Sequence, residues 1–252
     1  VRTISDLNRK LQNGEWHEFV LINEAMHEKK IAMIADEIVK KKKRIILIAG
    51  PSSSGKTTFA QRLCIQLRVN GMRPLYMGTD DYFVERGQAP RDENGKYNFE
   101  DLEAVDIELF NDQMNALLAG ETVDMPVFDF ITGSKRYGMR ITRAEDDQPI
   151  VIEGIHALNP DVIGHSDDYT NRVYVSVRTR LESGGELLHP SKIRLMRRLI
   201  RDKLYRGRSI TETMEFFKSV ERGEDLYIMP YKHRASFDID TFIAYEPMVY
   251  RD

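Results

Sequence analysis

The eight residues Gly50 to Thr57 constrain this chain more than any other feature of its sequence. They read G-P-S-S-S-G-K-T, a full match to the pattern GxxxxGK[ST]. A short apolar run at 45–49 precedes them, and a helical pattern at 58–69 follows and ends at an Asn-Gly pair. This order predicts a buried strand, a phosphate-binding loop and a helix. The alternative, a glycine-rich turn that binds nothing, is disfavoured because motif and context agree.

Such a loop binds phosphate because its glycines let the backbone N–H groups point inward, and because the helix N-terminus adds partial positive charge. Lys56 is placed to reach the β- and γ-phosphates of ATP, and the Thr57 hydroxyl to coordinate Mg²⁺. The loop alone does not separate a small-molecule kinase from a GTPase or a motor. The base-reading pattern Asn-Lys-x-Asp of GTPases is absent, however, and the chain is short for a motor. The residues expected to bind ATP here are Gly50, Ser52, Ser53, Ser54, Gly55, Lys56, Thr57 and Thr58.

The rest of the pattern alternates strands with helices. The predicted strands are 45–49, 74–79, 150–153, 172–177 and 242–245, with an extended segment at 123–131; the predicted helices are 19–40, 58–69, 106–118, 192–205 and 210–220, and 84–100 is a predicted loop. This order indicates an α/β domain of three layers around a mainly parallel sheet, a P-loop NTPase-type fold with an Arg-rich helical lid. We expect residues 1–40 to be an N-terminal helical segment or linker and residues 41–252 to be the kinase domain, with the lid at about 178–209.

Composition narrows the possible partners. The net charge of the 252 residues is −3, so there is no global attraction to nucleic acid or anionic lipid, and any phosphate site is local. No apolar run approaches the ~20 residues that span a bilayer. The single cysteine, Cys64, excludes an intrachain disulfide and fits the cytoplasm. Because the chain begins at Val1, we expect it to belong to a longer protein.

Acidic residues follow two of the predicted strands. Asp80 and Asp81 come after the second strand, and one of them, with Asp80 favoured, is placed to accept the proton of an attacking hydroxyl. The alternative is a carboxylate that caps the next turn. Glu153 ends another buried strand, as a Walker B acid does, and is a candidate ligand of Mg²⁺. It could instead merely end the strand.

A strongly basic helix is predicted near the C-terminus. Arg194, Arg197, Arg198 and Arg201 share one helix face, and Arg206 and Arg208 follow it. Four like charges on one face repel each other unless a polyanion neutralises them, and phosphoryl transfer needs such cations. We therefore interpret the helix as a lid, movable about the joint 183–185, rather than as an ordinary solvated face.

These segments, in this order, resemble the uridine–cytidine kinase branch of the phosphoribulokinase/uridine kinase family. The resemblance covers about residues 45–245. Beyond the phosphate loop it rests on D-D-Y-F at 80–83, N-F-E-D-L-E-A-V-D at 98–106, P-V-F-D-F at 126–130, I-E-G-I at 152–155, R-R-L-I-R-D at 197–202 and Y-R-G-R at 205–208. The chain is similar to a bacterial subgroup in which such a kinase follows threonyl-tRNA-synthetase-like N-terminal domains. Relatives often assemble as homo-oligomers, although the sequence carries no interface signature.

The resemblance implies roles for these residues. ATP and Mg²⁺ would be the cofactors, and the acceptor would be the 5′-hydroxyl of a pyrimidine nucleoside. The implied roles are proton acceptor for Asp80, ribose binding for Glu100, acceptor contact for Tyr82, Phe128 and Phe130, transition-state and acceptor contact for Arg198 and Arg201, and phosphate binding for Arg206 and Arg208. Core packing is an equally good interpretation of Phe128 and Phe130.

Two departures concern the base. Pyrimidine nucleoside kinases carry a His that hydrogen-bonds the base, and that position falls at Gly133 here. The family's Tyr is Phe128, so a hydroxyl is also missing. Losing such groups costs specificity. Two alternatives therefore stay open: a kinase for another hydroxylated metabolite, such as a sugar phosphate or a polyol, and a regulatory module that senses ATP without turnover.

Overall fold

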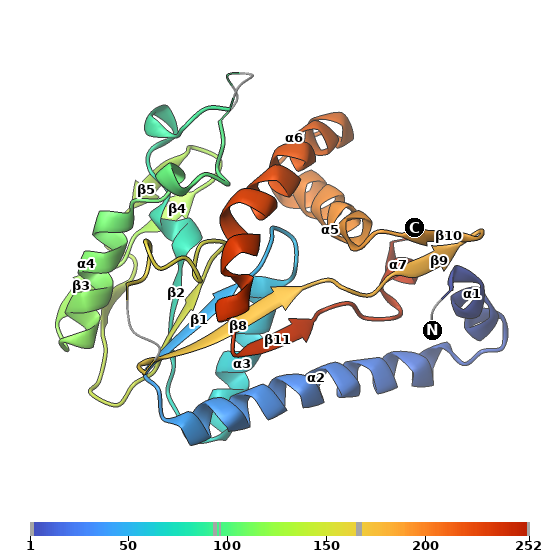
Figure 1. Cartoon of the computed structure of the whole chain (residues 1–252), viewed down its shortest axis with the longest axis horizontal. Helices are drawn as coiled ribbons and strands as arrows, with labels where there is room; N and C mark the ends of the chain where they lie inside the picture. The colour runs from blue at the N-terminus through green and yellow to red at the C-terminus, as the bar shows by residue number, and fades with distance from the viewer. Residues whose placement is uncertain (1–2, 93–94, 96, 165–167, 251–252) are drawn as a thin grey trace.

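A parallel sheet forms the centre of the computed structural model, which describes residues 3–92, 95, 97–164 and 168–250. Within these residues the sheet has five strands in the order β11-β8-β1-β7-β2, all parallel (Figure 1). The strands are β1 (Ile45–Ala49), β2 (Leu75–Gly78), β7 (Ile150–Glu153), β8 (Thr170–Ser176) and β11 (Phe237–Asp240). The mainly parallel sheet predicted from the sequence is confirmed.

The two faces of the sheet bury alternate side chains of the same strands. In β1, Ile45 and Leu47 pack on the side of α4 (Ile107–Leu118). Ile46 and Ile48 pack on the opposite side, against α2 (Trp16–Lys41) and α3 (Lys56–Val69). Apolar runs without polar alternation are typical of parallel strands covered on both faces. The three predicted layers follow from this arrangement.

Helices α5 (Pro190–Tyr205) and α6 (Ile210–Gly223) lie beyond the carboxyl end of β1 (Figure 1). The N-terminus of α6 is held by a capping box between Ser209 and Glu212. Smaller elements surround this frame: α1 (Ile4–Gln12), α7 (Glu246–Val249), and the antiparallel pairs β3 (Thr122–Asp124) with β6 (Ile141–Arg143), β4 (Val127–Asp129) with β5 (Ser134–Arg136), and β9 (Leu181–Ser183) with β10 (Glu186–Leu188). No helix in the described part of the chain combines the length and the apolar character needed to cross a membrane.

The last predicted strand was wrong in position. Residues 242–245 lie in an irregular segment and a turn, and the strand is β11, five residues earlier. The reason is that β11 is an edge strand in which only Ile239 is fully buried, so it needs fewer apolar residues than a central strand. The extended segment expected at 123–131 is two short strands, β3 and β4, each paired with a different partner. In the loop expected at 84–100, residues 93, 94 and 96 lie outside the described residues.

The glycines expected to form a joint have a different place in the structure. Gly184 and Gly185 have φ of 62° and 87° and form the tip of the β9–β10 hairpin. Positive φ at both central residues matches the twist of a two-residue hairpin turn. Leu181 of the same hairpin packs against Ile193 of α5. The glycines therefore shape a hairpin tip and are not a free hinge before α5.

One glycine of the phosphate loop is required by packing. A Cβ added to Gly50 would lie 1.9 Å from the carbonyl oxygen of Val175 in β8. We expect Gly50→Ala to lower the free energy of unfolding by about 1–3 kcal/mol, because backbone must move. The melting temperature should fall by about 2–4 °C for each kcal/mol. The control is Gly87→Ala, since a Cβ there meets no atom within 4 Å; equal melting temperatures of the two variants would contradict the prediction.

Candidate active site

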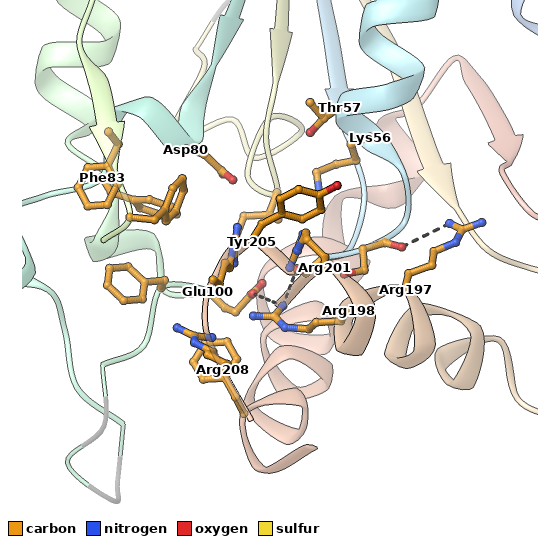
Figure 2. A pocket seen from close by; sticks show the side chains of 18 of the residues that line it. Lys56, Thr57, Asp80, Phe83, Glu100, Arg197, Arg198, Arg201, Tyr205 and Arg208 are labelled. Carbon is orange, nitrogen blue, oxygen red and sulfur yellow. Dashed lines mark hydrogen bonds and ion pairs between the residues drawn. The ribbon is translucent and has the colours of Figure 1, made fainter. Parts of the chain in front are cut away.

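A cavity of about 750 Å³ lies at the carboxyl edge of the sheet. Three strands bring its polar groups together, because Glu153 at the end of β7 is in register with Ile48 of β1 and Gly78 of β2. The phosphate loop after β1, Glu153, and Asp80 after β2 therefore leave the sheet at one level. Parallel sheets bind ligands at this edge. In Figure 2 the Asp80 carboxylate lies between Phe83 on one side and Lys56 and Thr57 on the other.

The loop expected to bind phosphate has the conformation for it. Gly55 is the N-cap of α3 with φ of 88°, and Ser53 has φ of 60°. Lys56 is buried, and its ammonium donates to the carbonyl oxygen of Pro51 at 3.2 Å. Of the residues predicted for this function, the structure brings Ser52, Ser53, Gly55, Lys56, Thr57 and Thr58 to the cavity wall. Gly50 and Ser54 are buried behind it and shape the loop.

Thr57 and Glu153, the predicted magnesium ligands, are in contact. The Thr57 hydroxyl donates to Glu153 Oε2 at 3.1 Å, and the Tyr76 hydroxyl donates to the same oxygen at 3.0 Å. Burial raises the pKa of Glu153, and Lys56, 3.9 Å away, opposes this shift. Hydroxyl and carboxylate oxygens are ligands that suit Mg²⁺.

The two neighbouring aspartates have different surroundings. Asp81 accepts a hydrogen bond from Arg140 at 2.6 Å and another from the backbone N–H of Phe128 at 3.2 Å. Asp80 lines the cavity, and its carboxylate makes no hydrogen bond or ion pair with any residue that the structure describes. A carboxylate in a cavity with free lone pairs is able to accept a proton. Asp81 instead holds β4 in place.

Glu100 faces the same cavity from the loop before α4. Its carboxylate lies 3.8 Å from the Arg198 guanidinium (Figure 2), and the end of α6 at Gly223 packs against its stem. Burial raises the pKa of Glu100, and Arg198 opposes this shift. The expected acceptor contact is therefore paired with an expected catalytic arginine.

A buried carboxylate organises the arginines beside the cavity. Asp202 of α5 has 0% exposure, and its carboxylate oxygens lie 3.3–3.8 Å from the arginine guanidiniums around it. Its backbone carbonyl accepts the N–H groups of Arg206 and Arg208, each at 3.1 Å. The guanidiniums that contact its carboxylate are those of Arg198, Arg201, Arg206 and Arg208. Asp202 belongs to the motif at 197–202, but no role was predicted for it from the sequence.

The remaining arginines of the basic face have carboxylate partners too. Arg194 pairs with Glu224, and Arg197 donates to Glu246 at 2.7 Å. Each arginine of this face therefore has a carboxylate partner within the chain, although Asp202 is shared by four guanidiniums, and binding of a polyanion at the face stays a prediction. Helix α5 also contacts the phosphate loop directly: Arg198 donates to the Ser52 hydroxyl at 2.7 Å. Burial lowers the pKa of Arg198 to about 10.

Aromatic side chains form the other side of the cavity. Phe83 packs edge-on against Phe99, Phe128 and Phe130, with ring centroids 5.4–6.2 Å apart. The Arg206 guanidinium lies 4.8 Å from the centre of the Phe130 ring. Phe128 and Phe130 both line the cavity and also pack against each other, so their packing role is confirmed and their contact with an acceptor stays a prediction.

Tyr82 lies elsewhere. It is buried in the core, and its hydroxyl donates to Gln113 at 2.8 Å, so the structure does not bring it to the cavity. Phe83, one residue later, lines the cavity instead. Cavity-lining residues for which the sequence predicted no role are Phe83, Arg86, Phe99, Ile131, Ile155, Tyr205 and Phe216; Arg197, which also lines the cavity, was predicted only as part of the basic helix face. These residues share only that they are apolar, aromatic or basic and lie in or near a motif. That feature is too common in one sequence to predict that a residue lines a cavity.

Fold and cavity together define a P-loop kinase of the α/β class. The model of the Phosphoribulokinase / Uridine kinase family matches residues 45–244. The chain is 31% identical over 195 residues to the uridine kinase of Chloroflexus aurantiacus, covering 76% of this chain and 83% of that one. It is 29% identical over 202 residues to the uridine kinase of Anoxybacillus flavithermus, covering 80% and 87%. The chain belongs to the phosphoribulokinase/uridine kinase family and is an ATP-dependent kinase.

Solved structures agree on the fold. A putative fructose transport system kinase from a Silicibacter species superposes with a TM-score of 0.60 at 17% identity, covering 83% of this chain and 98% of the other. A possible uridine kinase from Bacillus stearothermophilus gives 0.57 at 21% identity, covering 84% and 98%. Similarity to the bacterial subgroup in which such a kinase follows threonyl-tRNA-synthetase-like N-terminal domains, and the boundary near residue 40, stay predictions.

We expect Asp202→Asn to destabilise the fold by about 3–5 kcal/mol, because it leaves Arg198, 2% exposed, without its nearest carboxylate. Asparagine keeps the shape and the backbone acceptor, so the effect isolates the charge. Urea unfolding measures it, with the exposed Asp225→Asn as control. A loss below about 1 kcal/mol, as for a surface ion pair, would contradict the central place of Asp202.

A buried histidine predicts a pH dependence. His156 is 1% exposed, and burial lowers its pKa from 6.5 to about 4. The unfolded chain then binds more protons than the folded one between these values, so stability present above pH 6.5 is lost as the pH falls toward 4, by up to about 3 kcal/mol. Urea unfolding at pH 7 and pH 5 should show a smaller loss for His156→Asn than for the exposed control His17→Asn. Equal losses of stability in the two variants would refute the assignment of this pH dependence to His156.

Proposed function

We propose that this protein transfers the γ-phosphoryl group of ATP to the 5′-hydroxyl of a pyrimidine nucleoside. The observation that carries the proposal is the free Asp80 carboxylate in the same cavity as the phosphate loop. An acceptor hydroxyl beside Asp80 would face phosphates held by Lys56 and the loop amides. The similarity to uridine kinases supports the nucleoside as acceptor.

Asp80 accepts the proton of the hydroxyl as its oxygen attacks the γ-phosphorus, and the bond from that phosphorus to the bridging oxygen breaks. Glu100 binds the sugar hydroxyls, and its ion pair with Arg198 holds it toward the cavity. Arg198, Arg201, Arg206 and Arg208 stabilise the charge that develops on the transferred group and on the leaving phosphate. Asp202 keeps these guanidiniums together without a bound ligand.

Thr57 and Glu153 fit a magnesium ion, since their oxygens are 3.1 Å apart beside the loop. The bound ion would neutralise phosphate charge. Among the described residues no cluster of three or more His, Cys, Asp or Glu side chains could hold a metal. Mg²⁺ is typically held by one or two protein oxygens together with the phosphates of the substrate, so this small set is sufficient.

A second acceptor class, another hydroxylated metabolite such as a sugar phosphate or a polyol, is favoured by Gly133 and Phe128, which lack the base-reading groups. It would use the same phosphate loop and the same Asp80. A regulatory module without turnover is disfavoured, because an ATP sensor has no need of Asp80 or of the arginines around the transferred group.

We expect Asp80→Asn to lower kcat with uridine by about 10²–10⁴-fold, the usual contribution of a general base. The KM for ATP should change little, because Asp80 does not belong to the phosphate loop. ADP release from ATP–Mg²⁺ measures both quantities across uridine, cytidine, sugar phosphates and polyols. Asp112→Asn, an exposed residue of α4, is the control.

Each outcome has a distinct meaning. Turnover of uridine or cytidine that Asp80→Asn abolishes supports the proposal. Turnover of a polyol or a sugar phosphate alone would keep the mechanism and replace the acceptor. Full activity of Asp80→Asn with its best acceptor would show that Asp80 is not the general base.

A further inference from the structure

Arg86 covers the glycine that stands at the family's base-reading position. A Cβ on Gly133 would lie 2.6 Å from Arg86 Nε and 2.7 Å from Arg86 Cβ. The two residues are also joined through the backbone, since the Arg86 N–H donates to the Gly133 carbonyl at 2.9 Å. Space that a side chain at 133 would need is therefore filled by Arg86. This residue lies in the loop after β2, where sequence reasoning assigned no function.

Arg86 lines the cavity, and one side-chain hydrogen bond leaves other guanidinium donors available. Arg86 Nη2 donates to the carbonyl oxygen of Phe130 at 2.8 Å, which fixes the side chain against the aromatic wall. Within the described residues Arg86 forms no ion pair with a carboxylate, unlike Arg194, Arg197 and Arg198. Arginine offers several N–H donors and no acceptor. What it recognises in the cavity must therefore present oxygen or another acceptor.

The aromatic wall beside Arg86 is hydrocarbon, and the Arg206 guanidinium, another donor, lies 4.8 Å from the centre of the Phe130 ring. Phe83, Phe99, Phe128 and Phe130 are hydrocarbon rings, and the hydroxyl that a Tyr at 128 would supply is missing. A flat ring suits such a wall, since aromatic rings pack edge-on or stacked. The polar edge of that ring would then meet the donors of Arg86.

We propose that Arg86 is the specificity-determining residue of the acceptor side, where it takes the place of the missing histidine. The proposal rests on the nucleoside function proposed above. With Asp80 and Glu100 engaged by the sugar, the base is the part left for the aromatic wall. Uracil presents a carbonyl oxygen at position 4, and cytosine presents an amino group. We place position 4 of the base toward Arg86; in that orientation the donor-only guanidinium binds the oxygen of uracil and leaves the amino group of cytosine unpaired, so Arg86 selects uridine over cytidine.

The test compares kcat/KM for uridine, cytidine and the pyrimidin-2-one ribonucleoside, which lacks the oxygen at position 4. Wild type should prefer uridine. Arg86→Ala should lose about 10- to 100-fold on uridine, the usual effect of removing a hydrogen bond from a charged donor. For the other two nucleosides the kcat/KM of Arg86→Ala should stay close to that of wild type, and so should its KM for ATP. Arg86→Lys should recover part of the preference for uridine.

A matched pair of glycine variants tests the same point without a substitution at Arg86. Gly133→Ala should displace Arg86 and reduce the preference for uridine. Gly138→Ala imposes comparable backbone strain, since the φ values of the two glycines are 72° and 81°, but a Cβ at 138 meets no atom within 4 Å. It should keep the wild-type preference.

Failures are distinguishable. If Arg86→Ala lowers kcat/KM equally for all three nucleosides, Arg86 only supports the loop around Phe130. The specificity proposal is then overturned, while the kinase proposal stands. A wild type without preference for uridine, or an unchanged preference in Arg86→Ala, overturns it as well. If wild type turns over none of the nucleosides but phosphorylates another acceptor, the nucleoside assignment itself fails and this proposal falls with it.

Discussion

The site depends on one buried carboxylate. Asp202 has no exposed surface, yet it lies among the guanidiniums of Arg198, Arg201, Arg206 and Arg208. Without a central negative charge these cations would repel one another, and burial would penalise each. With it, they stay beside the phosphate loop, which Arg198 contacts through Ser52. Asp202 therefore establishes the charged half of the cavity before any nucleotide binds.

The sheet supplies the other half of the constraint. Because β1, β2 and β7 are parallel and in register, their carboxyl ends deliver the phosphate loop, Asp80 and Glu153 to one level. The acids that meet there are then distinguished by their neighbours. Glu153 is bonded by Thr57 and Tyr76, whereas Asp80 keeps its lone pairs free. One sheet edge thus provides both a candidate ligand for a cation and a candidate acceptor for a proton.

The sequence could not show several features because they depend on contacts between distant segments. From the sequence, Asp81 was an alternative candidate base to its neighbour Asp80. In the structure Asp81 accepts a hydrogen bond from Arg140, which lies 59 residues away in the chain. Tyr82 matched a motif, but its hydroxyl is bonded to Gln113 in the core. The edge strand at Phe237–Asp240 has too little buried surface to stand out from the more apolar residues that follow it. Arg86 packs against Gly133, 47 residues later in the chain, in space that a larger side chain at 133 would fill.

The sequence by itself determined the phosphate loop, the parallel α/β fold and the family, because these depend on local patterns: a glycine spacing, apolar runs and motifs in one order. It also identified most of the residues that line the cavity. Only the tertiary structure decided which residues are paired and which are free, because pairing depends on distances across the fold. It placed Asp202 among the arginines, paired Arg194 and Arg197 with Glu224 and Glu246, and placed Arg86 against Gly133 at the cavity.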